Sequence, residues 1–449
     1  MGRAHGGNLG RGSVVRAPVG HWDGRYHRAV AAPAHLLINA RRPGRPDGGP
    51  VAIAVDTDGI VTAVLDRTDE VDAATRSAIE IVDLGGRLVL PALAEPHAHL
   101  DKARTADLAP NPTGDLPGAI DAWIAAEAAG RFTHDDMVER ITTELGRLLL
   151  AGVTCVRSHL NVGGRVGATH LVAARTAAER YRTVMDIEFV ALTHTPTAGP
   201  GSEHNRRAVA EALELGIEVI GGCPHLEPDP GGAIEYVLDI ASTHGVRIDL
   251  HTDETTDPTM LTLETLAEAV RRRDPGVAVT ASHCVSLGMA PVEVQQRVAT
   301  RVGEAGVAVI ALPQTNLFLQ GRDHPVGTPR GLTAIGALRS AGVVLAAGAD
   351  NAQDPFNLVG RSDPLETAAM MVMAGHVLPD DAFAMVSNAA RAAIGHAPVG
   401  AEVGQRADLV AVPATSIRQT VAEAPADRMV LRGGRLVART TSESVLHLG

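Results

Sequence analysis

Lysine is almost absent from this 449-residue chain: it occurs once, at Lys102, among 40 basic residues. Aromatic residues make up 2% of the chain, so Ala, Val and Leu must supply most of the core packing. The three cysteines lie far apart and show neither a CxxC pair nor the spacing of a disulfide framework, which indicates a reducing cytoplasm. No apolar run is long enough to cross a bilayer, so we expect no membrane partner.

The charge balance and the first residues exclude further classes of protein. The net charge is −12, from 52 acidic and 40 basic residues. Such a chain repels phosphate backbones, so we expect no nucleic-acid partner. The stretch from Met1 to about His27 is rich in Gly and Arg and lacks the apolar region of a secretory signal. We expect residues 1–30 to be a disordered extension, either native or the product of a start codon placed too far upstream.

Both ends of the chain show short alternating apolar runs interrupted by Asp-Gly and Gly-Gly. Examples are VAIAVDTDGIVTAV and IEIVDLGGRLVL near the start, and ADLVAVP and RMVLRGGRLVART near the end. This pattern predicts β-hairpins. We therefore expect residues 31–88 and 396–449 to build one small β-sandwich-like domain together.

Between these ends, residues 89–395 alternate β-rich apolar runs with helical stretches. Eight such runs occur: RLVLPALAEP, VTCVRSH, DIEFVALTH, IEVIGGCP, RIDLH, VAVTASH, VAVIALP and VVLAAGAD. Helices are expected between them, for example over 135–150, 204–215 and 258–273. Eight parallel strands with intervening helices predict an α/β fold, a (β/α)8 TIM barrel.

Six or more of the predicted strands end in a residue that can ligate a metal or move a proton. These residues are His97, His99, His159, His194, His251, His283 and Asp350. In such barrels the carboxyl ends of the strands form the active-site face. The spacing His97-x-His99 puts both imidazoles on one face of a strand. Imidazole with carboxylate suits zinc or iron rather than calcium or magnesium.

Six segments carry a resemblance to a known family. EPHAHLDKA, FTHDDM, HTDETTD, TASHCVS, TNLFLQGR and GADNAQDPFNLVG are similar to motifs of the bacterial cytosine deaminase branch of the amidohydrolase superfamily, and they occur in that family's order. The resemblance implies one divalent metal ion, Zn or Fe, held by His97, His99, His251 and Asp350. Many relatives bridge two metals with a carboxylated Lys at the end of strand four. That strand ends here in GGCPHLEP, without Lys, so we expect a mononuclear site.

The same resemblance implies catalytic roles. The metal would generate hydroxide from water near neutral pH. Asp350 would accept the water's proton, His283 would orient the water, and Glu254 would shuttle a proton to the ring nitrogen and the leaving amine. Two alternatives stay open at this point. Glu254 can be a solvated carboxylate at a helix start, and His283 can be a hydrogen-bonded core residue.

The residues expected to bind substrate depart from the cytosine enzymes. Those enzymes carry Gln where this chain has His194, and a second Asp where it has Asn351. The only Lys, Lys102, follows the His pair, either by chance or because a compact ammonium is needed there. We expect Lys102, Leu116, His194 and Asn351 to contact the substrate, and cytosine to be a poor one.

Together these patterns predict a cytosine deaminase-like enzyme, a metal-dependent hydrolytic deaminase of a small nitrogen heterocycle. The alternative reaction is cleavage of a ring amide or an alkylamino C–N bond, as in aminotriazines or cyclic amidines. A more distant alternative is a catalytically silent barrel that only binds. We expect a small heterocyclic substrate as the partner, and a homo-oligomer as the assembly.

Overall fold

The computed structural model describes residues 34–44 and 49–447, so the expected disordered extension over 1–30 lies outside the described residues. The described residues belong to one compact unit, and the predicted division of this unit into domains stays a prediction. No helix in the described part of the chain is long and apolar enough to cross a membrane.

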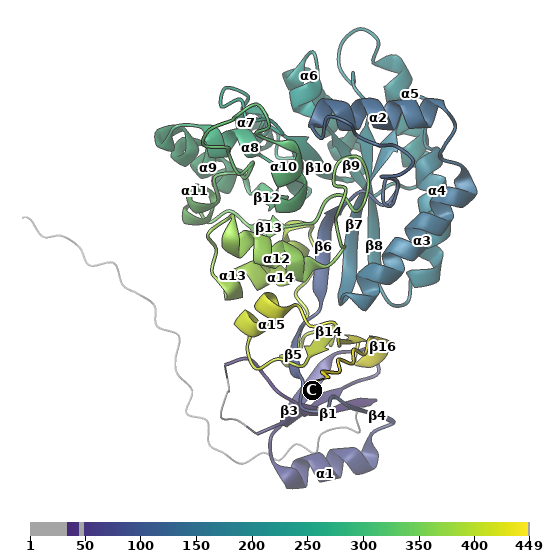
Figure 1. Ribbon diagram of the computed structural model, residues 1–449, viewed down its shortest axis with the longest axis vertical. Helices are drawn as coiled ribbons and strands as arrows, with labels where there is room; N and C mark the ends of the chain where they lie inside the picture. Colours follow the sequence, from purple (N-terminus) through teal and green to yellow (C-terminus); the bar gives the residue numbers. More distant parts are fainter. Residues whose placement is uncertain (1–33, 45–48, 448–449) are drawn as a thin grey trace, which may run out of the picture. The chain divides into compact units, whose positions relative to one another are not determined.

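Eight parallel strands form one sheet that curves into a barrel (Figure 1). In sheet order from first to last they are β6 (Leu93–Ala98), β7 (Val153–Val162), β8 (Asp186–Thr193), β9 (Val219–Gly222), β10 (Arg247–Thr252), β11 (Val279–His283), β12 (Ala308–Ala311) and β13 (Leu345–Ala347). Each coincides with one of the eight predicted runs. The prediction of a (β/α)8 barrel is therefore confirmed.

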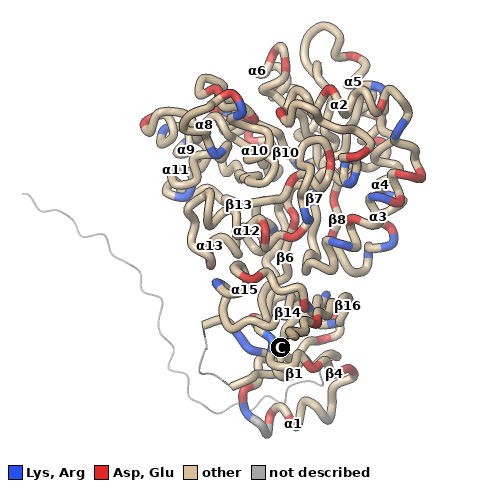
Figure 2. The backbone as a smooth tube through the Cα atoms, in the orientation of Figure 1, with Lys and Arg blue, Asp and Glu red and all other residues tan. Residues whose placement is uncertain are grey.

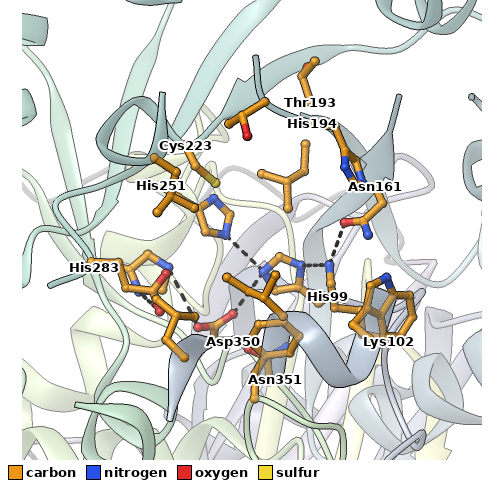
Figure 3. A pocket seen from close by; sticks show the side chains of 18 of the residues that line it. His99, Lys102, Asn161, Thr193, His194, Cys223, His251, His283, Asp350 and Asn351 are labelled. Atoms are coloured by element: carbon orange, nitrogen blue, oxygen red, sulfur yellow. Dashed lines mark hydrogen bonds and ion pairs between the residues drawn. The ribbon is translucent and has the colours of Figure 1, made fainter. Parts of the chain in front are cut away.

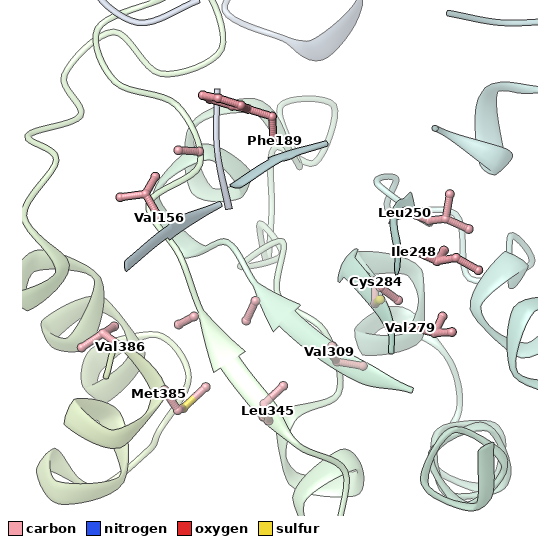
Figure 4. Packing of buried hydrophobic residues seen from close by; sticks show 14 of the residues in the cluster. Val156, Phe189, Ile248, Leu250, Val279, Cys284, Val309, Leu345, Met385 and Val386 are labelled. Atoms are coloured by element: carbon pink, nitrogen blue, oxygen red, sulfur yellow. The ribbon is translucent and has the colours of Figure 1, made fainter. Parts of the chain in front are cut away.

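Alternation along the strands separates the core from the barrel interior. On β7, Val156 and Leu160 belong to the main hydrophobic cluster, which also holds residues of the flanking helices. Figure 4 shows Val156 in this cluster with Phe189 of β8 and Leu250 of β10. Because successive side chains of a strand point to opposite faces, Arg157 and the residues that alternate with it face the interior.

Helices cover the barrel strands and, in the case of α1, the strands near the start of the chain. They are α1 (Thr68–Ser77), α2 (Leu116–Ala128), α3 (His134–Leu150), α4 (Thr169–Ala178), α5 (Glu203–Glu214), α6 (Pro230–His244), α7 (Thr262–Arg273), α8 (Val285–Met289), α9 (Val292–Ala305), α10 (Pro313–Leu319), α11 (Ile335–Ser340), α12 (Pro364–Met373), α13 (Pro379–Met385), α14 (Asn388–Ala393) and α15 (Ile417–Glu423). The helices expected over 135–150 and 204–215 are confirmed by α3 and α5. The third was placed too early: α7 begins at Thr262, because the Asp253 carboxylate accepts hydrogen bonds from the backbone N–H of Thr262 and Leu263.

The seam between the first and last barrel strands is closed by a side chain. β6 and β13 lie at opposite ends of the sheet order. The Glu95 carboxylate accepts hydrogen bonds from the backbone N–H of His97 at 3.1 Å and of Ala349 at 3.0 Å. The backbone N–H of Asp350 donates to His97 O at 3.0 Å. Two segments that are far apart in the sequence, each with predicted metal ligands, are thereby held in a fixed relation.

The chain ends form two four-stranded sheets, as predicted. One sheet has the order β3 (Val61–Leu65), β2 (Val51–Val55), β1 (His35–Ala40), β4 (Glu80–Asp83). The other has β16 (Arg435–Arg439), β15 (Met429–Arg432), β14 (Leu409–Val412), β5 (Leu88–Pro91). Both contribute to one hydrophobic cluster, with Ile53 and Val82 from the first sheet and Leu409 and Leu431 from the second.

One predicted hairpin is wrong. β4 pairs in parallel with β1, whereas β5 pairs antiparallel with β14, so IEIVDLGGRLVL crosses from one sheet to the other. Gly85 and Gly86 have positive φ and allow the sharp turn, but the turn leads to a new partner strand. The hairpins formed by β2 with β3 and by β15 with β16 are confirmed.

Candidate active site

A cavity of about 220 Å³ opens at the carboxyl ends of the barrel strands. Its lining includes every predicted site residue except His97: Lys102, Leu116, His194, His251, Glu254, His283, Asp350 and Asn351, together with His99. Figure 3 labels most of these side chains, among them His99, His251, His283 and Asp350, which converge on one space. His97 lies beneath them, fully buried.

The four predicted metal ligands present their donor atoms to one another. His99 Nε2 lies 3.1 Å from His251 Nε2 and 3.2 Å from Asp350 Oδ1. His97 Nε2 lies 3.5 Å from the same Asp350 oxygen. Ligands at zinc–nitrogen distances of 2.0–2.1 Å in a tetrahedron are roughly 3.3 Å apart. The ligand set therefore has nearly the spacing that one small divalent cation requires.

Buried atoms without hydrogen-bond partners also occur among these predicted metal ligands. Within the described residues, His97 Nε2 and both carboxylate oxygens of Asp350 are buried without a hydrogen-bond partner. Burial lowers the pKa of His97 and His251 well below the ordinary value, so both imidazoles are neutral and have a lone pair to offer. Buried polar atoms without partners are costly, and a bound cation would satisfy them. The residues present thus fit a divalent metal.

The other ring nitrogen of His97, Nδ1, contacts a polar network deeper in the barrel. His97 Nδ1 lies 2.9 Å from Ser282 Oγ, which donates to Asp249 Oδ1 at 3.1 Å. Arg157 donates from Nη1 to Asp249 Oδ2 at 2.8 Å and from Nε to the carboxylate of Glu188 at 2.7 Å. If Nδ1 carries the proton and donates to Ser282, the Nε2 lone pair of His97 is left free for a metal.

His283 is oriented by a neighbouring amide. His283 Nδ1 lies 3.1 Å from Asn316 Oδ1, an acceptor, so the proton sits on Nδ1. His283 Nε2 is then an acceptor, and it lies 4.0 Å from Asp350 Oδ2. His283 and Asp350 both have positive φ, at 68° and 67°. Such strained backbone positions in residues other than glycine gather at functional sites.

Glu254 is a buried carboxyl group beside His283. Its side chain lines the cavity, and Glu254 Oε1 lies 3.6 Å from His283 Nδ1. Burial, and then the nearby negative charge of Asp350, raise the pKa of Glu254 well above its ordinary value. Asp253 caps α7 and so fixes the loop that carries Glu254. The alternative of a solvated helix-start carboxylate is wrong, because Glu254 is only 8% exposed.

Lys102 lies inside the cavity in a network of polar atoms. Lys102 Nζ is 2.9 Å from Asn161 Oδ1 and 3.0 Å from His99 Nδ1 (Figure 3). The His194 ring lies close by against Gly164, where a Cβ atom would come within 2.9 Å of His194 Nδ1. Burial, and then Lys102, lower the pKa of His194, so its ring is neutral. His194 can thus offer one donor and one acceptor to a ligand.

Asn351 lines the cavity, and its side-chain amide is hydrogen-bonded to other residues of the protein. Asn351 Nδ2 donates to Asp354 Oδ2 at 2.8 Å, and its Oδ1 lies 3.4 Å from Thr315 Oγ1. The amide of Asn351 is therefore held by a fully buried Asp that does not itself line the cavity. Leu116 lines the wall as expected, at the start of α2.

Sequence reasoning missed several lining residues: Ile120, Trp123, Ile124, Asn161, Leu192, Thr193, Thr195, Cys223, Leu226 and Phe356. Only Asn161 had a usable signal, because it lies on the same face of β7 as His159, two residues away. His159 itself does not line the cavity; its ring packs on that of His97 with centroids 3.9 Å apart. Burial raises the pKa of the Cys223 thiol to about 12, which makes it a poor metal ligand.

A model of the amidohydrolase family matches residues 124–438. The chain belongs to this family. It is 30% identical over 419 residues to a pterin deaminase from Rhizobium rhizogenes, covering 92% of this chain and 93% of that protein. The structure of 5-methylcytosine deaminase from Klebsiella pneumoniae superimposes with a TM-score of 0.80 at 25% identity, covering 92% of this chain and 100% of that one.

A third relative is named for the removal of an isopropylamino group, rather than for a deamination. N-isopropylammelide isopropylaminohydrolase from Burkholderia multivorans matches with a TM-score of 0.75 at 26% identity, over 91% of this chain and 98% of that one. The matches confirm the predicted family, the barrel fold and a metal-dependent hydrolase of C–N bonds in nitrogen heterocycles. Members of the family use a metal ion, whereas the identity and number of the ions in this chain stay predictions.

Proposed function

We propose that this enzyme removes the exocyclic amino group of a pterin-type heterocycle, in which a ring carbon bearing –NH2 is close to a ring oxo group. Water adds to that carbon and ammonia leaves, so that the C–NH2 group becomes a second oxo group. One divalent ion, zinc or iron, held by His97, His99, His251 and Asp350, would supply hydroxide from water.

A single observation carries the proposal. Unpaired ligand atoms and a buried carboxyl group of raised pKa face the same cavity. A barrel that only binds has no use for a proton shuttle beside a set of metal-ligating side chains. Perturbed acids that gather in one cleft indicate catalysis.

Three side chains have assignable tasks. Asp350 keeps Oδ2 free of protein partners and accepts the proton of the attacking water. His283 Nε2 accepts a hydrogen bond from that water and so orients it. Glu254, whose raised pKa keeps it protonated to a higher pH than a free carboxyl group, donates a proton to the leaving amine. A well-placed general acid contributes about 10²–10⁴-fold.

The size and lining of the cavity favour a bicyclic ring over cytosine. Beyond the polar floor, Leu116, Ile120 and Trp123 of α2 form an apolar wall against which a second fused ring can pack. A pterin deaminase is the relative with 30% identity.

A second candidate reaction is removal of an alkylamine. The same apolar wall can hold an alkyl substituent on the leaving nitrogen, and a relative named as an isopropylaminohydrolase matches at 26% identity. Both candidate reactions use the same metal ligands and the same proton shuttle. They differ in whether the apolar wall contacts a second fused ring or an alkyl substituent.

An ammonia-release screen tests the proposal. Purified enzyme with measured metal content is offered pterins, pyrimidines, aminotriazines, N-alkylaminotriazines and creatinine-like rings. We expect the highest kcat/KM with a pterin. Alkylamine release that exceeds ammonia release from every pterin would replace the proposal with the second candidate. An enzyme with full metal content and no turnover of any ring would contradict both.

A further inference from the structure

We propose that Asn161 determines which ring is accepted, by donating its side-chain amide N–H to a ring oxo group of the substrate. The inference rests on the proposed function and concerns the same cavity. It assigns a specificity residue that the sequence comparison with the cytosine enzymes did not reveal.

The orientation of the amide follows from its neighbour. Lys102 Nζ lies 2.9 Å from the side-chain oxygen of Asn161. An ammonium group has only donors, so the atom that faces it must be the oxygen and not the amide nitrogen. This holds whichever ring nitrogen of His99 carries a proton. The Nδ2 group of Asn161 therefore points away from Lys102, and it makes no hydrogen bond to another described residue.

The position of Asn161 is fixed as well as its orientation. Its backbone N–H donates to Asp101 Oδ2 at 3.0 Å, and the same oxygen lies 2.8 Å from His170 Nδ1. Asn161 is paired in register with Leu192 of β8, and it is 6% exposed at the cavity wall. A donor held this rigidly discriminates strongly, because it cannot turn to suit another ligand.

Asn161 and His194 lie side by side on this wall, at the ends of the neighbouring strands β7 and β8 (Figure 3). His194 can adapt, since a neutral imidazole offers one donor and one acceptor. Asn161 offers donors alone, so an amino group placed opposite it would leave two donors facing each other without an acceptor. A site that hydrogen-bonds one ring group rejects analogues without it by up to about 10⁴–10⁵-fold.

Exchanging the donor for an acceptor tests the inference. Asn161→Asp keeps the shape and the oxygen that faces Lys102, but it removes the N–H donors. Pterin is compared with its diamino analogue, in which an amino group replaces the ring oxo group. We expect the ratio of kcat/KM for pterin to that for the diamino analogue to fall by at least about 10²-fold, with unchanged metal content. A ratio that stays constant while both values fall would show a merely structural role.

A second variant is used because Asn161→Asp could fail to fold. Asn161→Ser removes the donor without adding charge. It should lose more kcat/KM on pterin than on the same ring without the oxo group, whereas equal losses would overturn the inference. Binding of the dioxo product, lumazine, is measured alongside and should weaken in both variants. A wild type that neither turns over nor binds any pteridine overturns the proposed function together with the inference; an active wild type with unmoved ratios overturns the inference alone.

Discussion

Two layers of the barrel interior hold buried ionisable groups, and they differ in whether those groups have partners. In the lower layer, Arg157 is fully buried and donates to Glu188, Asp249 and the backbone oxygen of Ile394. In the upper layer, at the carboxyl ends of the strands, His97 Nε2 and both Asp350 oxygens have no partner among the described residues.

The difference separates structure from function. A buried charge that is paired on every side stabilises one arrangement of the strands and leaves nothing for a ligand. Buried polar atoms without partners cost free energy, so they persist where a ligand completes them. Outside the barrel, Arg is interspersed with Asp and Glu along α3, as Figure 2 shows. Charge alone therefore does not locate the site.

The largest effect is expected from the upper layer itself. Asp350→Ala should abolish turnover and strip the metal, because it removes a ligand and the proposed base together. Ammonia release and metal content per chain measure the result. Asp380→Ala, an exposed carboxylate in the first turn of α13, is the matched control and should leave both unchanged. Retained metal with partial activity would show that Asp350 is not a ligand.

The substrate wall should reject cytosine. The cytosine edge is expected to fit His194 poorly, and mismatched polar groups in a buried site cost up to about 10⁴–10⁵-fold in selectivity. We predict that kcat/KM for cytosine lies below the usual enzyme range of about 10⁴–10⁸ M⁻¹s⁻¹. A value within that range would show that His194 can replace the family's Gln.

Glu254→Gln should keep the metal and lose about 10²–10⁴-fold in kcat, because Gln is nearly isosteric but cannot donate the proton. The matched control is Glu227→Gln, a buried residue outside the cavity lining that accepts from the backbone N–H of Thr197. Loss of metal from the Glu254 variant would mean that Glu254 is a ligand.

The pH dependence of the rate tests the same role of Glu254. Since burial raises the pKa of Glu254 well above its ordinary value, the group keeps its proton to a higher pH than a free carboxyl group and loses it as the pH rises through the raised pKa. The wild-type rate should therefore fall on the alkaline side, and Glu254→Gln should lack this limb. An alkaline limb of equal size in the variant would assign it to another group.

The lower layer should respond in stability rather than chemistry. Arg157→Met leaves the buried Asp249 carboxylate without its cationic partner and removes one of the two Arg partners of Glu188, the other being Arg247. Breaking a buried pair in this way typically costs about 3–5 kcal/mol of unfolding free energy. Denaturant unfolding measures it. Arg182→Met is the control, since its ion pair with Glu179 is exposed and such pairs contribute about 0–1 kcal/mol. If the Arg157 variant were as stable as the wild type, the lower layer would not have the structural role that distinguishes it from the upper layer.

The sequence predicted the barrel and the ligands because both have local signals. Each strand lies in an apolar run, and several of these runs end in His or Asp, as in RIDLH. The hairpin error around Gly85 shows the limit: a Gly-Gly turn looks the same whether the chain returns to its own sheet or enters another. The partner of β5 is β14, which lies near the other end of the chain.

The substrate wall was harder to predict for two physical reasons. α2 is apolar on most sides and follows a loop rich in Pro and Gly, so its residues show no clear helical periodicity, although Trp123 and Ile120 line the cavity. The second predicted strand was ended at His159, whereas β7 continues to Val162 and so brings Asn161 to the wall. Which of two same-face residues reaches a cavity depends on tertiary packing.

The metal content of the purified enzyme tests the central claim most directly. His97, His159 and Asp249 also lie close enough together to hold an ion, but Arg157 donates to Asp249 from 2.8 Å and would repel a cation there. We therefore predict about one tightly bound divalent ion per chain by elemental analysis, zinc or iron, lost on Asp350→Ala and retained on Glu254→Gln. A reproducible content near two per chain, or an active enzyme without metal, would contradict the account.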